Sequence, residues 1–147
     1  MQFHQHDGGR AAAGFQGPAG DCAVRAVSIA MERDYREVYD ELDTFAQEFE
    51  QRWRAEQRPG EFFPSSSSGG YWFEALTAYL EPFGWEYTAG PTELYQRLHL
   101  RAKELPNGPI ITRLSGQYAA VIDGVLSTVY DCSRDEYFVY GYWRKKE

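Results

Sequence analysis

Cysteine is scarce in this chain of 147 residues, which has only Cys22 and Cys132. Two cysteines are too few for the disulfide framework of a small secreted domain. No signal peptide is recognisable, and no apolar run approaches the ~20 residues of a membrane span. Metal-binding motifs are also missing, and His4 and His6 lack a cluster of further ligands. We therefore expect a cytoplasmic protein with no membrane contact, no metal and no other cofactor.

Positive charge is in deficit, with 15 Lys and Arg against 22 Asp and Glu and a net charge of −7. A general nucleic-acid-binding protein would present a basic face, so the balance argues against a nucleic-acid partner and permits a basic one. The length suits one domain over residues 1–147 with a real core. Aromatic residues make up 16% of the chain, which suits a packed core and an adhesive surface.

The first two thirds of the chain have helical periodicity. Residues 1–20 are rich in Gly and Ala and predict an extended arm, and residues 22–31 predict a short buried helix. Asp34 and Glu37 form a capping box, which predicts an amphipathic helix running to about residue 56. Residues 64–70 predict a flexible Ser/Gly loop, and residues 71–81 another helix. Residues 85–87 suit a short strand and residues 92–98 a helical turn.

The last third changes to the two-residue period of strands. Strands are expected over residues 109–115, 117–122, 125–130 and 137–143, with Asp123-Gly124 as a hairpin turn. Helices followed by an antiparallel sheet indicate an α+β fold.

The most informative motif joins Gln16 to Cys22 through a Gly-rich turn, six positions apart. The amide of Gln16 and the backbone N–H of Cys22 would form an oxyanion hole. A helix starting at Cys22 would lower the pKa of its thiol through the helix dipole. This motif resembles that of the papain-like cysteine hydrolases, which implies a nucleophile helix packed on a later antiparallel sheet. The alternative is a small core cysteine at a helix start.

A papain-like site also needs a His base and an Asn or Asp that orients it. The matching segment here is residues 115–125, followed by Tyr130-Asp131-Cys132. The whole chain is also similar to a group of uncharacterised phage and prophage proteins. The shared blocks are residues 7–15, 20–22, 35–40, 99–101, 120–125, 130–134 and 139–143. Members of that group usually have His where this chain has Gln117.

Gln117 has no titrating proton and cannot act as a general base. His99, or His4 or His6 on the arm, could substitute, or the site could lack a base. A two-residue Asp123-Gly124 turn would place Gln117 opposite Tyr130, with Asp131 on the other face. A longer loop or a bulge would pair Gln117 with Asp131 and rebuild a triad-like geometry. The sequence leaves both arrangements open.

An aromatic set flanks the Ser/Gly loop and includes Phe62, Phe63 and Trp72. These side chains would either enter the core or form an exposed binding patch. The acidic residues of the 34–56 helix suit a solvated face or a surface for a basic partner.

Two functions follow from these patterns. The first is a papain-like pseudoenzyme of phage type that binds a host protein, such as a defence factor, in the host cytoplasm. The second is an active cysteine peptidase or amidase that uses Cys22 with an unconventional base. Under either function the expected site comprises Cys22, Gln16, Gln117 and Asp131.

Overall fold

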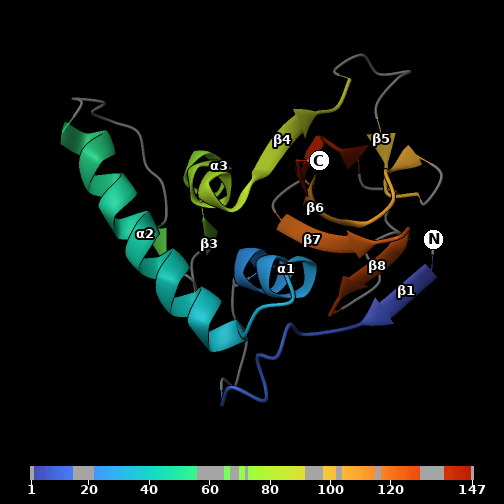
Figure 1. Cartoon of the computed structure of the whole chain (residues 1–147), viewed down its shortest axis with the longest axis horizontal. Coiled ribbons are helices and arrows are strands. Elements are labelled where there is room, and N and C mark those ends of the chain that lie inside the picture. Colours follow the sequence, from blue (N-terminus) through green and yellow to red (C-terminus); the bar gives the residue numbers. More distant parts are fainter. Residues whose placement is uncertain are drawn as a thin grey trace.

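The computed structural model describes residues 2–14, 22–55, 65–66, 70–71, 73–91, 98–101, 104–114, 117–129 and 138–146. The described residues form three α-helices and a large, mostly antiparallel sheet, so the predicted α+β class is confirmed (Figure 1). The helices are α1 (Cys22–Ala30), α2 (Tyr35–Ala55) and α3 (Phe73–Leu80), and the 3₁₀ helix η1 (Glu81–Phe83) follows α3. No described helix is both long and apolar enough to cross a membrane.

The main sheet has six strands in the order β1-β8-β7-β6-β10-β4. Its strands are β1 (Gln2–Gln5), β4 (Trp85–Ala89), β6 (Pro109–Leu114), β7 (Gln117–Ile122), β8 (Val125–Thr128) and β10 (Gly141–Lys145). All neighbours are antiparallel except β1 and β8, which run parallel. Two short pairs lie outside this sheet: β2 (Ser65–Ser66) with β3 (Gly70–Tyr71), and β5 (Leu98–His99) with β9 (Phe138–Val139).

The hairpin between β7 and β8 has the two-residue turn that the sequence predicts. Ile122 pairs with Val125, and Asp123 and Gly124 both have positive φ, of 49° and 79°. Such angles belong to the turn type whose twist matches that of the flanking strands. The turn is tied down because the side chain of Asp123 accepts a 2.7 Å bond from the Gly108 N–H. Of the two registers that the sequence leaves open, the ladder at Ile122 therefore follows the two-residue one.

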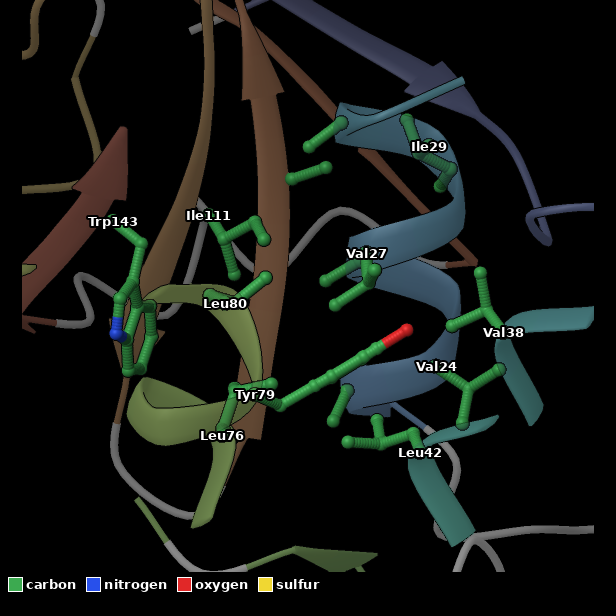
Figure 2. Packing of buried hydrophobic residues seen from close by; sticks show 14 of the residues in the cluster. Val24, Val27, Ile29, Val38, Leu42, Leu76, Tyr79, Leu80, Ile111 and Trp143 are labelled. Carbon is green, nitrogen blue, oxygen red and sulfur yellow. The ribbon is translucent and has the colours of Figure 1, made fainter. Parts of the chain in front are cut away.

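Helix α1 is the centre of the larger core cluster. Its residues from Ala23 to Ala30 are buried apart from Arg25, as expected for a helix with few charges. One side of α1 packs on β7 and the other on α2. In Figure 2, Val24 lies beside Val38 and Leu42 of α2, while Ile111 and Trp143 come from the sheet. A second cluster, which includes Leu126, Val121 and Val139, fills the opposite face of the sheet.

The helix predicted from Asp34 onward is confirmed as α2. Asp34 caps its first turn, because the Asp34 carboxylate accepts a 3.0 Å bond from the backbone N–H of Glu37. The side chain of Glu37 pairs with Arg33. Helix α3 likewise lies inside the predicted 71–81 segment, and β4 covers the short strand expected at residues 85–87.

Two segments form more regular structure than the sequence predicts: the N-terminal arm, residues 1–20, and the Ser/Gly loop, residues 64–70. Gln2–Gln5 form an edge strand, and Gly8 packs so closely on α1 that an added Cβ would lie 3.1 Å from Arg25 Cα. Ser65–Ser66 of the expected Ser/Gly loop pair with Gly70–Tyr71, so Tyr71 is in a strand and not in the expected 71–81 helix. Leu98, the end of the expected 92–98 turn, begins β5, and residues 92–97 lie outside the described residues.

Candidate functional site

Cys22 is the first residue of α1 and its side chain is half-buried. This position at the N-terminus of a buried helix, over the antiparallel sheet, confirms the expected placement of the cysteine. No acidic residue occupies the first turn of α1. The positive end of the helix dipole therefore lies at Cys22 with no carboxylate in that turn to offset it.

Tyr118, the second residue of β7, lies near enough to Cys22 to be influenced by its charge. The pKa of Tyr118 is raised to about 12, mainly because burial disfavours the phenolate and next because of the charge of Cys22. Arg113 acts in the opposite direction on the same hydroxyl. It is the partner of Tyr118 in the β6–β7 register. The thiol, the phenol and the guanidinium thus form one electrostatic group.

Aromatic rings extend this group across the sheet. Trp143 lies 5.6 Å from Tyr118 and 4.9 Å from Tyr87 between ring centroids. The guanidinium of Arg113 stands 4.0 Å from the ring centre of Phe73, a cation–π distance. Neither Tyr118 nor Arg113 was predicted as a site residue. The alternation of Ala120 and Ile122 in β7 is the signal that would have pointed to Tyr118, since these three share one face.

Gln117 precedes Tyr118 at the first position of β7, is half-buried and pairs with Leu114. Because successive side chains of a strand alternate between its two faces, Gln117 lies on the face of β7 opposite to the residues that face α1. A direct contact between Gln117 and Cys22 stays a prediction. The remaining expected site residues, Gln16 and Asp131, lie outside the described residues, as do Cys132 and the three expected binding residues, Phe62, Phe63 and Trp72.

The three histidines are engaged elsewhere in the fold. His4 and His6 contact each other at 5.5 Å, and Nδ1 of His6 accepts a 2.9 Å bond from the Gly8 N–H. Both belong to the arm at β1, and β8 separates that strand from β7. His99 on β5 lies 3.4 Å from the carboxylate of Glu104. None of these described interactions joins an imidazole to Cys22.

Within the described residues, no group of three or more His, Cys, Asp or Glu side chains could hold a metal ion. Comparison of the chain with protein-family models, with curated proteins and with solved structures finds no match in any of the three.

Proposed function

We propose that the protein is a papain-like pseudoenzyme that works as a protein-binding module. The observation that carries the proposal is the pKa of Tyr118, raised to about 12 beside Cys22. A phenol with that pKa stays protonated near neutral pH and does not remove a proton from the thiol. Its neighbour Gln117 has no proton to exchange at any ordinary pH. In an active papain-like site this strand carries the general base. Here neither Gln117 nor Tyr118 can act as that base.

The layout around Cys22 supports the papain-like part of the proposal. A cysteine at the start of a buried helix, packed on an antiparallel sheet, is the arrangement that the resemblance implies. The helix dipole would still polarise the thiol, so Cys22 would retain moderate reactivity without turnover.

The similarity to phage and prophage proteins supports a host protein, such as a defence factor, as the partner. The net charge of −7 favours partners with basic surfaces. A binding role does not need the thiol, so Cys22→Ala should leave complex formation unchanged.

Alkylation of Cys22 by iodoacetamide across pH tests the proposal. The experiment uses a Cys132→Ser background, so that the rate reports on Cys22 alone. We expect a thiol pKa above ~7, since no imidazolium stabilises the thiolate. A pKa well below ~7, together with hydrolysis of a peptide or amide that Cys22→Ala abolishes, would overturn the proposal.

Restoring the base gives the converse test. Gln117→His would place an imidazole at the position that the related phage proteins use, and alkylation near neutral pH should then accelerate. Gln117→Asn is the matched control, because it changes the side chain without adding a base. Equal rates in the two variants would mean that position 117 does not reach Cys22.

The second candidate is an active cysteine peptidase or amidase. The half-exposed position of Cys22 at the start of α1 favours it, because a nucleophile must meet both substrate and solvent. That function requires a base from the arm, so His4→Ala and His6→Ala should then abolish turnover. The pseudoenzyme predicts no effect of either variant on partner binding.

A further inference from the structure

An apolar groove of about 580 Å³ lies between α2 and the α3–η1 segment. Five of its lining residues come from α2: Asp40, Glu41, Thr44, Phe45 and Glu48. Tyr79 of α3 and Phe83 of η1 form the facing wall. The groove shares α3 with the group around Cys22, through Tyr79 and Phe73 respectively, but has no residue in common with it.

Three aromatic rings form the floor of the groove. Tyr79 lies 5.6 Å from Phe45 and 5.5 Å from Phe83 between ring centroids. Phe83 keeps 39% of its surface exposed, which is unusual for a phenylalanine that has aromatic neighbours to pack against. A partner side chain that covered this ring would bury further apolar area without any rearrangement of the wall.

Carboxylates form the rim, and none of the described residues that line the groove is Lys or Arg. Asp40 is 61% exposed and holds Arg36 only loosely, at 3.4 Å. Glu48 is exposed and makes no ion pair within the part of the chain that the structure describes. Glu41 completes the rim above Tyr79, whose hydroxyl donates a 2.9 Å bond to it. This charge repels acidic ligands and favours a cation at the mouth of the groove.

Arg33 shows how a guanidinium uses this surface. Its Cζ lies 5.1 Å from the ring centre of Phe83, and its Nη2 contacts the Glu41 carboxylate at 2.7 Å. Its Nη1 also donates a 3.0 Å bond to the Tyr79 hydroxyl. One edge of the groove therefore already holds a cation between an aromatic face and a carboxylate. Phe45 and Glu48 bring another aromatic ring and another carboxylate to the lining of the groove.

We propose that this groove binds a basic segment of a partner protein, in which an arginine or lysine neighbours a large apolar side chain. The apolar side chain would cover Phe83 and Phe45, and the cation would pair with Glu48 and Asp40. This inference rests on the proposed function as a binding module and assigns it a surface. Charge complementarity selects this occupant over an acidic peptide, a nucleic acid or an anionic lipid.

Fluorescence anisotropy with a labelled synthetic peptide tests the proposal on the full chain. The probe peptide repeats arginine and leucine at the spacing of one helical turn, and the matched peptide has glutamate in place of arginine. We expect the arginine peptide to bind with an affinity that falls as salt rises, and the glutamate peptide not to bind. Phe83→Ala should weaken binding about tenfold, and Glu48→Lys by a similar factor.

Two control variants separate the groove from general attraction. Glu86→Lys reverses an exposed charge on β4, and Tyr140→Ala truncates a side chain that is 45% exposed at the sheet. Neither should change the affinity. Absence of binding, equal binding of both peptides, or equal losses for Glu48→Lys and Glu86→Lys would each overturn the proposal. So would a change of oligomeric state in Phe83→Ala, because the groove would then be covered by a second copy.

The failure of this inference is distinguishable from that of the proposed function. Hydrolysis that depends on Cys22 would overturn the pseudoenzyme proposal, whereas the affinities for the peptides would stay unchanged. If the arginine peptide does not bind and Cys22 catalyses no hydrolysis, only the proposal for the groove is overturned.

Discussion

Tyr118 and Gln117 are adjacent in β7, and of the two Tyr118 is the one that interacts with the charge of Cys22. Burial and the charge of Cys22 raise the pKa of Tyr118 to about 12. The phenol is therefore neutral in the folded protein near pH 7. Gln117 is neutral at every pH. Under the proposed function, activation of the thiol rests on the dipole of α1, a contribution that is smaller than that of an imidazolium partner.

The pKa of Tyr118 predicts a loss of stability at alkaline pH. The folded-state value of about 12 exceeds the unfolded-state value of ~10. The neutral phenol therefore stabilises the fold fully below pH ~10, and this contribution is lost as pH rises towards ~12. We expect Tyr118→Phe to flatten the fall in the free energy of unfolding over that interval, as measured by urea denaturation. Tyr79, whose pKa is raised to about 12 mainly by burial, leaves a remaining slope.

The control for this measurement is Tyr140→Phe, which removes a hydroxyl from an exposed tyrosine. It should retain the wild-type slope. Equal slopes in wild type and Tyr118→Phe would show that the environment of Tyr118 does not disfavour its ionisation.

At the scale of elements, α2 is anchored at its start by Arg33 and Asp34. Asp34 caps the helix, while the guanidinium of Arg33 contacts Glu37, Glu41 and Tyr79 and so ties α2 to α3. These contacts raise the pKa of Arg33, chiefly through Glu41, and lower that of Glu41, chiefly through Arg33. The side chain of Arg33 is only 16% exposed, so its pairs are better shielded from solvent than ordinary surface pairs.

We expect Arg33→Ala to lower the free energy of unfolding by about 2 kcal/mol, because it removes the charged donor that Glu41 and Tyr79 share. Arg36→Ala is the matched control: its pair with Asp40 is exposed on both sides, and its loss should cost about 0.5 kcal/mol or less. Denaturation by urea at neutral pH measures both. Equal effects of the two variants would contradict an anchoring role for Arg33.

Elements with local signals could be predicted from the sequence. Asp34 and the apolar spacing after it predicted the start and the length of α2, and Asp123-Gly124 predicted the β7–β8 turn. Cys22 was placed correctly for the same reason, since the Gly-rich turn and the helix that follows are neighbours in the chain. Tyr118 and Arg113 were missed because their closeness depends on which strand edge α1 covers and on the β6–β7 register. Neither is encoded within a single segment.

At the scale of the whole molecule, the sheet joins segments from both ends of the chain. Residues before α1 form β1, which pairs in parallel with β8, and β4 from the middle of the chain pairs with β10 near the C-terminus (Figure 1). A four-residue strand such as Gln2–Gln5 carries too little pattern to reveal its partner. The extended arm expected there was therefore correct in conformation at β1, while its place in the sheet required the three-dimensional structure.

The edge strand predicts how the molecule responds to losing residues 2–5. Phe3 packs against the second core cluster, and β1 covers the hydrogen-bonding edge of β8. Their removal should cost about 2–3 kcal/mol, which corresponds to a fall of roughly 5–10 °C in Tm for a domain of this size. The open edge of β8 should also promote aggregation, visible by size-exclusion chromatography. Phe3→Ala separates the two causes, because it removes the packing and retains the edge pairing. An unchanged Tm after the deletion would mean that β8 does not need β1, and that the arm contributes nothing to the sheet in solution.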